Sequence, residues 1–320
     1  MSGGSEIMSV NNFPLVTIGI PTYNRANGFL KNAIESALSQ TYGNIEVIVS
    51  DNCSPDNTPE VVKSIKDNRI RYFRQKENIG PNNNFNFCVS QAKGEYFLLL
   101  QDDDLIDKDF VETCLSAVDY RTDVGIIRTG TRVIDDKGDE IKEYPNRAEG
   151  ESFYDLILSW FQFKTAFYLC STMFNTKGLK EIGGFRSKHN LFQDVVAEVK
   201  LAASLGFKNV SDIKASFRKH PGEMTFAAKV VNWCEDSLYL LSLIADLIPD
   251  KREIILKKGK KFFAHLNYNK ACAVKPEKDK LKAYYIVYKS FGFTEPPPRI
   301  KRVITGNPVY RGIGYIKRRL

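Results

Sequence analysis

The sequence predicts an α/β protein in which a mostly parallel sheet is flanked by helices and followed by a helical C-terminal extension. Short, continuous apolar runs alternate with segments of helical spacing, and these runs lie at residues 15–20, 45–50, 70–73, 95–100 and 124–127. Such runs are typical of strands that are buried on both faces, as in a parallel sheet covered by helices. Beyond residue 228 the apolar pattern is helical.

Helix signals occupy the gaps between the expected strands. One set of apolar residues repeats at helical spacing and consists of Phe29, Leu30, Ala33, Ile34, Ala37 and Leu38. Pro59 suits the first turn of a second helix, and Asp107 is expected to cap a helix that carries Phe110. A helix that carries Val195 and Val199 is expected to end at Gly206.

Three regions follow from this pattern. Residues 1–13 are polar and are expected to be a disordered N-terminus or the remnant of a tag. Residues 14–225 are expected to form the α/β domain, and residues 226–320 a basic, mainly helical region. No run of about 20 apolar residues occurs in the chain, so no transmembrane helix is expected.

The charge of the chain is unevenly distributed. Residues 226–320 contain 20 Lys and Arg against 8 Asp and Glu, whereas residues 1–225 contain 26 against 30. A basic C-terminal third indicates an anionic partner, either a membrane or a nucleic acid. The competing interpretation is a solvated helical face without a partner.

The cysteines and histidines do not predict a zinc site. The six cysteines form no CxxC pair and the three histidines are widely separated in the sequence. This usage is typical of reduced thiols in a cytosolic protein.

Polar residues follow three of the expected strands at the same end. Residues 21–25 follow the first strand, Asp51 ends the second, and residues 102–104 end the fourth. Because ligands of open α/β sheets bind at the carboxyl ends of the strands, these residues are expected to share one site.

Three consecutive aspartates at the end of an apolar strand require a positive partner. Asp102, Asp103 and Asp104, without cysteine or histidine beside them, favour a hard cation such as Mg²⁺ or Mn²⁺. One carboxylate could bind the metal, another could accept hydrogen bonds from ribose hydroxyls, and a third could hold the loop. The alternative is a solvated acidic turn that caps the next helix.

The order of motifs resembles glycosyltransferase family 2, whose members use nucleotide sugars and have the GT-A fold. Over roughly residues 14–225 the family's motifs are matched, in order, by PTYNR, VSDNCSPDNT, ENIGPNNNFN and AKGEYFLLLQDDD. Each piece is weak alone, but the combination in one order is specific. The resemblance implies a Rossmann-like, mostly parallel sheet and a transferase activity.

The resemblance also implies a donor site. Pro21 and Tyr23 would flank the nucleotide base. Thr22, Asn24 and Arg25 would shape the same loop. Asp51 would accept a hydrogen bond from the base, as expected for uracil or thymine.

Further along the chain, Asn78 and Gly80 would belong to the donor site. Asp102 and Asp103 would contact the ribose. The metal ligands would come from Asp103 first, then Asp104 and Asp102, with His220 in reach.

Two positions depart from the family pattern. Gln101 stands where the family often has the leading aspartate, so the division of roles among residues 102–104 stays open. Asn52 and Cys53 replace a second aspartate and a glycine in the base-binding loop.

The second half of the domain carries one more landmark. The segment FQDVVAEVKLAASLG resembles a family helix in which an aspartate acts as the general base of inverting members. Asp194 takes that position and Lys200 that of a basic residue. Without the resemblance, Asp194 would be interpreted as an acidic first-turn residue that is favoured by the helix dipole.

Residues 217–225 stand where the family has a flexible loop over the donor. Arg218 and His220 could balance the charge of the diphosphate, and a basic surface loop is the alternative.

Together these residues predict a metal-dependent inverting glycosyltransferase with Mn²⁺ or Mg²⁺ as cofactor. The donor would be a UDP or dTDP sugar, and the acceptor a hydroxyl of a glycan or a lipid-linked sugar in cell-envelope polysaccharide synthesis. The alternatives are a nucleotidyltransferase or a non-catalytic protein that binds sugar nucleotides. The protein is expected in the cytoplasm, with peripheral contact to the inner face of the membrane or self-association through residues 226–320. No nucleic acid partner is expected.

Overall fold

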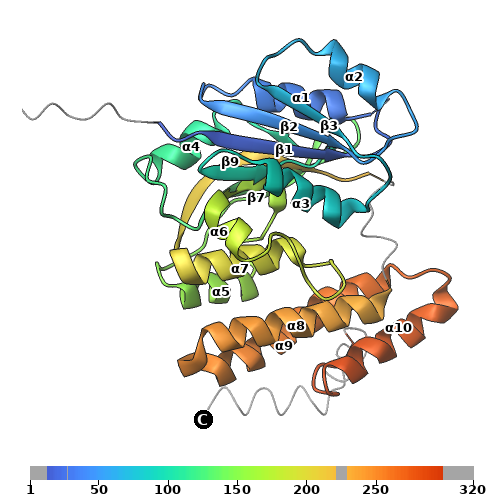
Figure 1. Ribbon diagram of the computed structural model, residues 1–320. Coiled ribbons are helices and arrows are strands. Elements are labelled where there is room, and N and C mark those ends of the chain that lie inside the picture. The colour runs from blue at the N-terminus through green and yellow to red at the C-terminus, as the bar shows by residue number, and fades with distance from the viewer. Residues whose placement is uncertain (1–12, 27, 221–228, 298–320) are drawn as a thin grey trace, which may run out of the picture. The chain divides into compact units, whose positions relative to one another are not determined.

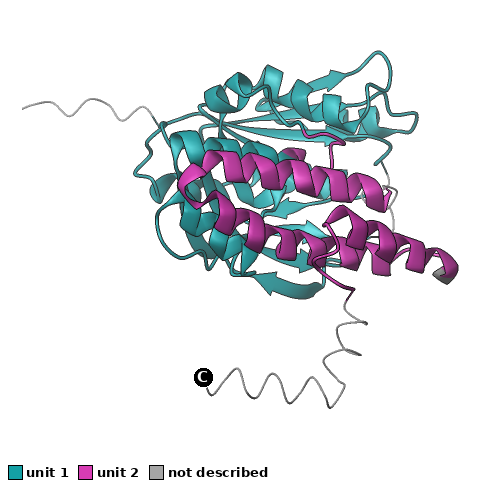
Figure 2. Cartoon of the chain, turned by 90° about the horizontal axis from the view of Figure 1, so that it is seen from below, with its two compact units in different colours: residues 1–186, 194–221 teal, residues 187–193, 222–320 magenta. Residues whose placement is uncertain are grey.

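The computed structural model describes residues 13–26, 28–220 and 229–297. The chain divides into two compact units (Figure 2). Unit 1 comprises residues 1–186 and 194–221, and unit 2 comprises residues 187–193 and 222–320. The expected boundary at residue 225 lies outside the described residues. Segment 187–193 groups with the C-terminal helices, which the sequence pattern did not indicate.

Unit 1 is built on a nine-stranded sheet with the order β3-β2-β1-β4-β8-β6-β9-β5, and β7 pairs with β6 (Figure 1). Its strands are β1 (Val16–Thr22), β2 (Ile45–Asp51), β3 (Ile70–Arg74), β4 (Tyr96–Leu99), β5 (Leu105–Ile106), β6 (Ile126–Ile134), β7 (Glu140–Tyr144), β8 (Thr172–Asn175) and β9 (Phe207–Arg218).

Strand direction matches the prediction in the first half of the sheet and departs from it in the second. β1 pairs parallel with β2 and β4, and β2 pairs parallel with β3. β8 lies antiparallel between β4 and β6, and β6 pairs parallel with β9. β4 and β6 therefore run in the same direction, and their carboxyl ends lie toward the same edge.

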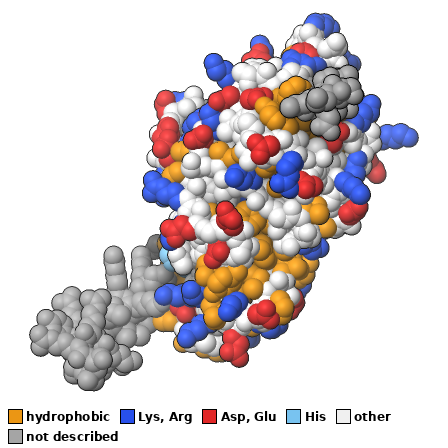
Figure 3. All heavy atoms as spheres, turned by 90° about the vertical axis from the view of Figure 1, so that its left-hand side faces the viewer, with side chains coloured by type: hydrophobic (Ala, Val, Ile, Leu, Met, Phe, Trp, Pro, Cys, Tyr) orange, Lys and Arg blue, Asp and Glu red, His pale blue; other side chains and the backbone are white. Residues whose placement is uncertain are grey.

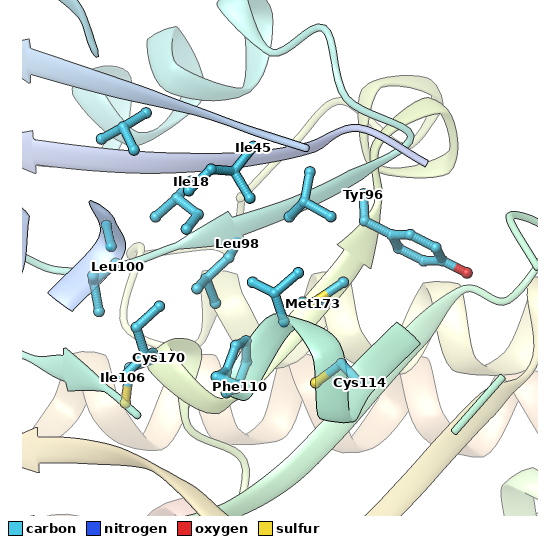
Figure 4. Packing of buried hydrophobic residues seen from close by; sticks show 14 of the residues in the cluster. Ile18, Ile45, Tyr96, Leu98, Leu100, Ile106, Phe110, Cys114, Cys170 and Met173 are labelled. Carbon is cyan, nitrogen blue, oxygen red and sulfur yellow. The ribbon is translucent and has the colours of Figure 1, made fainter. Parts of the chain in front are cut away.

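Helices cover both faces of this sheet. They are α1 (Leu30–Leu38), α2 (Thr58–Ser64), α3 (Pro81–Gln91), α4 (Phe110–Ser116), α5 (Phe153–Phe161), α6 (Thr176–Glu181) and α7 (Gln193–Leu205). One core cluster joins the sheet to α1 and α4, and Figure 4 shows Leu98 of β4 near Phe110 of α4. A second cluster joins the opposite side chains of the strands, such as Phe97 and Ile126, to α3 and α7. β1, β2 and β4 are thus buried on both faces, which explains why their residues are largely apolar without alternation.

The α-helices of the described C-terminal part of unit 2 are α8 (Val230–Leu247), α9 (Arg252–Cys272) and α10 (Glu277–Ser290). Each of these helices packs against the other two. The helical character expected beyond residue 228 is confirmed for the described residues, and the tail beyond residue 297 lies outside them. On the face of the molecule drawn in Figure 3, acidic and basic side chains are interspersed.

Most local helix signals are confirmed and one is wrong. Pro59 lies in the first turn of α2, and Gly206, with φ of 77°, directly follows α7. Asp107 does not cap α4, because that helix begins at Phe110. The Asp107 carboxylate instead accepts two hydrogen bonds from Arg132, at 2.7 and 2.9 Å. A bidentate guanidinium is a stronger partner for a carboxylate than a neutral backbone N–H.

Helix α7 runs antiparallel to β6. A Cβ atom on Gly125 would lie 2.4 Å from the carbonyl oxygen of Leu201, so the helix approaches the strand closely at that level. Three residues further along β6, Arg128 forms an ion pair with Glu198, which lies three residues earlier in α7. The N-terminal end of α7 therefore points toward the carboxyl edge of β4 and β6.

Candidate active site

The loop that follows β1 is held by side chains of the loop that follows β2. The backbone N–H of Asn24 donates to Ser54 Oγ at 2.9 Å, and that of Ala26 donates to Asp56 Oδ2 at 2.8 Å. Between them, the N–H of Arg25 donates to Thr58 Oγ1 at 3.3 Å. These bonds impose a defined shape on the segment, in which the φ angle of Asn24 is 58°. Asparagine is among the few side chains that tolerate this left-handed region.

Asp51 ends β2 in a fully buried position. Its Oδ1 accepts a hydrogen bond from Ser54 N at 2.8 Å, and its Oδ2 accepts one from the Tyr72 hydroxyl at 2.7 Å. Arg74 Nε lies 3.5 Å from the same Oδ2. Burial and the charge of Asp51 raise the pKa of Tyr72. Asp51 therefore shapes the loop through internal bonds.

Asn52 joins a third loop to this arrangement. Its Nδ2 donates to Asn78 Oδ1 at 2.8 Å, and its Oδ1 accepts from Ile79 N at 2.8 Å. Asn78 Oδ1 also accepts from Gly80 N, at 2.9 Å. An amide both donates and accepts, so asparagine makes this bridge, which an ionised aspartate could not. The departure from the family pattern at this position thus has a structural reason.

Cys53 occupies the other departure from the family pattern. Its φ angle of 63° lies in the left-handed region that glycine adopts without cost. A family glycine at this position is explained by that backbone angle.

The three aspartates after β4 lie in different surroundings. Asp104 is fully buried, and its Oδ1 accepts a hydrogen bond from the backbone N–H of Arg218 at 2.9 Å. Burial, followed by the charge of Asp103, raises the pKa of Asp104 well above its usual value. Burial and the same charge raise the pKa of Asp102 to about 7, against the opposing effect of Thr22 and Arg25. Asp104 therefore binds the backbone at the end of β9. The carboxylate of Asp102 is destabilised by the charge of Asp103.

Side chains from two other segments meet these carboxylates. Arg25 Nε lies 3.5 Å from Asp102 Oδ1, and an Arg25 terminal nitrogen lies 3.7 Å from Asp103 Oδ2. His220 Nε2 lies 2.9 Å from Asp103 Oδ2. The structure thus brings together the loop after β1, the aspartates after β4 and the residues after β9.

Arg218 lies at this edge with its side chain committed to internal contacts. Its Nε donates to the carbonyl oxygen of Asp103 at 2.8 Å, and one terminal nitrogen donates to that of Asp135 at 2.9 Å. The guanidinium also stacks 4.4 Å from the ring centre of Phe29. Arg218 is 3% exposed, so it supports the acidic loop from behind.

Asp194 lies in the first turn of α7, at the end of the helix that points toward the same edge. Burial raises the pKa of its carboxyl above the ordinary value, although backbone N–H groups at the helix start oppose the shift. A carboxylate with a raised pKa is a stronger proton acceptor, which suits a general base.

A buried ion pair that was not predicted from the sequence lies one helical turn after Asp194. Glu198 and Arg128 are both almost fully buried, and Arg128 Nε lies 3.2 Å from Glu198 Oε2. The guanidinium also stacks 4.1 Å from the ring centre of Phe167 and donates to Thr165 Oγ1 at 3.1 Å. The spacing of Asp194 and Glu198 is four residues, which places both carboxyls on one side of the helix. That spacing was visible in the sequence, but the distant arginine was not.

Burial raises the pKa of Glu198 to about 8, and the charge of Asp194 adds to the shift, whereas Arg128 opposes it. An ionised Glu198 would in turn disfavour the ionised form of Asp194, because like charges on adjacent turns repel. The protonation state of Glu198 is therefore coupled to that of the proposed base.

The acidic loop offers a small donor set for a divalent cation. Among the described residues, no group of three or more His, Cys, Asp and Glu side chains is arranged to hold a metal ion. Asp104 already binds the backbone of Arg218. Asp103 Oδ2 and His220 Nε2 lie 2.9 Å apart, within hydrogen-bonding distance of each other, and would supply one oxygen and one nitrogen donor. Mn²⁺ accepts such a mixed pair, and Mg²⁺ prefers oxygen.

The comparisons with known proteins identify the family. A model described as Glycosyl transferase family 2 matches residues 17–183, which is more than half of the chain. The chain therefore belongs to glycosyl transferase family 2.

Two relatives show how far the likeness extends. The chain is 31% identical to an uncharacterized glycosyltransferase of Rickettsia felis over 281 residues, which cover 81% of this chain and 44% of the relative. It is 34% identical over 138 residues to the GalNAc(5)-diNAcBac-PP-undecaprenol beta-1,3-glucosyltransferase of Campylobacter jejuni, covering 42% of this chain and 43% of that protein. The match thus spans less than half of the length of each relative.

Solved structures share the fold at low sequence identity. S. aureus TarS, crystallised with UDP-GlcNAc, superposes with a TM-score of 0.64 and 18% identity, over 87% of this chain and 81% of that chain. The mannosyltransferase PcManGT from Pyrobaculum calidifontis, in complex with GDP-Man and Mn²⁺, gives 0.55 and 17% over 94% and 83%. The α/β sheet and the GT-A fold that the resemblance implied are confirmed.

The Glu198 pair yields a prediction about stability. Because the pKa of Glu198 is about 8 in the folded protein and about 4.5 ordinarily, the folded state binds this proton more tightly than the unfolded state. This contribution to the free energy of unfolding is present below pH ~4.5 and is lost as pH rises toward ~8. We expect Glu198→Gln to flatten the pH dependence in this window, as measured by urea denaturation. Parallel curves for both proteins would contradict this assignment.

Proposed function

We propose that this chain binds a nucleoside-diphosphate sugar at the carboxyl edge of β1, β2 and β4 and transfers the sugar, with inversion, to an acceptor hydroxyl. The main support is the convergence of Arg25 and His220 on Asp102 and Asp103. An acidic loop flanked by an arginine and a histidine suits a ligand that brings both hydroxyl donors and a diphosphate. The family supports glycosyl rather than nucleotidyl transfer.

The nucleoside would lie on the loops after β1 and β2. Tyr23 is 45% exposed, so its ring can stack on a base beside Pro21, whereas Thr22 is buried. Asp51 would accept from the base N–H and would favour UDP or dTDP. Asn78 and Gly80 would close the same side of the pocket.

The diphosphate would lie beside Asp103 and His220, and these two residues would hold Mn²⁺ or Mg²⁺. The cation would neutralise charge on the departing diphosphate. Asp102 would remain available for the ribose hydroxyls. In this division of roles, Asp104 is structural, because its buried carboxylate binds the backbone of Arg218.

Asp194 would act as the general base. Its carboxylate would remove the proton from the acceptor hydroxyl while that oxygen attacks the anomeric carbon from the face opposite the diphosphate. The bond from the anomeric carbon to the diphosphate oxygen breaks, and the nucleoside diphosphate leaves with the electron pair. One displacement of this kind inverts the anomeric configuration.

The acceptor would be a glycan or a lipid-linked sugar of the cell envelope. The C. jejuni relative is named as an enzyme that acts on an undecaprenol-linked saccharide, and TarS has been crystallised with UDP-GlcNAc. These names support the acceptor class without specifying the sugar or the linkage.

A membrane surface would suit such an acceptor. No helix among the described residues is long and apolar enough to cross a membrane. Four exposed lysines lie within one and a quarter turns of α9, namely Lys257, Lys258, Lys260 and Lys261. Basic residues near an anionic bilayer contribute about 1 kcal/mol each to binding.

The first prediction of this proposal concerns the base. Asp194→Asn removes the proton acceptor and keeps the shape of the side chain, so we expect transfer to fall by about 10² to 10⁴. Release of UDP from a panel of UDP sugars measures transfer, and calorimetry with UDP measures nucleotide binding, which should be unchanged. Asp212→Asn, on the exposed part of β9, is the matched control. Full activity of the Asp194 variant would remove the base assignment.

The second prediction concerns the metal. Chelation with EDTA should weaken UDP binding at least tenfold, and Mn²⁺ should restore it in the native protein. Asp103→Asn and His220→Ala should each reduce the restoration, because each removes one of two protein donors. UDP binding that is indifferent to EDTA would eliminate the metal from the proposal.

The third prediction concerns the membrane. The native chain should float with vesicles that contain phosphatidylglycerol, and replacement of Lys257, Lys258 and Lys261 by glutamate should abolish flotation. Vesicles of phosphatidylcholine alone are the control, because they carry no net charge. Equal flotation of both proteins would show that these lysines are not the membrane contact. A dimer in gel filtration that the same substitutions dissociate would favour self-association instead.

A further inference from the structure

The segment that leads into the proposed base belongs to unit 2. Residues 187–193 group with the C-terminal helices, although they are enclosed in the sequence by unit 1 (Figure 2). Helix α7 begins at Gln193, and Asp194 follows immediately. Whatever fixes the backbone of residues 187–192 therefore restricts the entry of the chain into the first turn of α7.

A single buried carboxylate on α8 holds this segment. Asp236 is fully buried. Its Oδ1 accepts a hydrogen bond from His189 N at 2.7 Å, and its Oδ2 accepts from Leu191 N at 2.9 Å. The hydroxyl of Ser187 donates to Oδ2 as well, at 2.7 Å. The segment is thus wrapped around one acidic side chain.

Further contacts within unit 2 reinforce this anchor. Ser187 Oγ also accepts from Phe192 N at 3.3 Å, which closes the segment on itself. The ring of Phe192 meets the ring of Trp233 edge-on, at 5.4 Å between centres. Next to Asp236, Glu235 accepts from Lys188 at 2.7 Å and lies 2.8 Å from His189 Nε2. Asp236 lies in the centre of these contacts and Glu235 at their exposed margin.

The burial of Asp236 requires an explanation beyond general stability. Transfer of a carboxylate from water into a protein interior costs several kcal/mol, and three hydrogen bonds to the charge offset this cost. A well-packed apolar residue would stabilise helix packing at least as well. A carboxylate has one property that an apolar residue lacks: it fixes two backbone N–H groups at defined positions.

We propose that Asp236 is a positioning residue for Asp194. By binding the amides of His189 and Leu191, it fixes the direction in which the chain enters α7 and so orients the carboxylate of the base. This inference rests on the proposed role of Asp194.

The test compares neighbouring acidic residues of α8. Asp236→Asn keeps the volume and one acceptor oxygen, but it directs an NH₂ donor at groups that are themselves donors. We expect kcat to fall at least tenfold, with the KM for the nucleotide sugar and the Kd for UDP within twofold of the native values. Glu235→Gln removes only partly exposed ion pairs and should change kcat less than twofold.

Two further variants keep the inference falsifiable if Asp236→Asn folds poorly. Ser187→Ala removes one of three bonds and should lower kcat by several-fold without a change in UDP binding. In the Asp194→Asn background the same substitutions should have little further effect, because they act through the base. A lower melting temperature with native kcat for folded protein in both variants would overturn the inference.

The parallel assay of Asp194→Asn separates this inference from the proposed function. If that variant is inactive while the Asp236 and Ser187 variants are fully active, only the positioning role fails. If Asp194→Asn is itself fully active, the proposed role of the base fails first, and the positioning role fails with it.

Discussion

Repulsion among three adjacent carboxylates is the constraint on which this site depends. Asp102, Asp103 and Asp104 follow a buried strand, so water cannot screen them as it would on an exposed turn. The protein meets this constraint from two other segments, with Arg25 after β1 and with the residues at the end of β9. The contacts that offset this repulsion also bring those segments to one edge of the sheet.

The site is therefore a set of loops that hold one another. The loop after β1 is bonded to the loop after β2, which is bonded through Asn52 to the loop before α3. Bonds of this kind involve backbone N–H groups and fixed side chains, so they define positions more than they add stability. A site prepared in this way has little ordering left to do when a ligand binds, which favours affinity.

Much of the sheet and of the edge that carries the proposed site could be predicted from the sequence. Strands buried on both faces appear as continuous apolar runs. Because parallel strands end at the same edge of a sheet, the polar residues that follow them are assigned to that edge. Asp51 and Asp102 were assigned to this edge because local patterns reveal strand ends, whereas His220 was assigned to it by the family resemblance. The antiparallel β8 was not foreseen, because the pairing of four residues with β4 and β6 is decided by tertiary contacts.

The features that were missed are long-range pairs. Arg128 and Glu198 are 70 residues apart in the sequence, and Asp236 binds amides more than 40 residues before it. Neither set of contacts has a local sequence pattern. A charged residue can be predicted to be buried only when its distant partner is known. Asp107 shows the converse. Its local pattern indicated a helix cap, but its carboxylate binds the distant Arg132 instead.

The central claim is that the edge formed by β1, β2 and β4 holds a nucleoside diphosphate. A crystal structure of this chain with UDP and Mn²⁺ tests it most directly. The account predicts a uracil ring beside Tyr23, the diphosphate beside Asp103 and His220, and the carboxylate of Asp194 facing the open side of the terminal phosphate. A nucleotide bound elsewhere on the protein, with this edge unchanged, would contradict it.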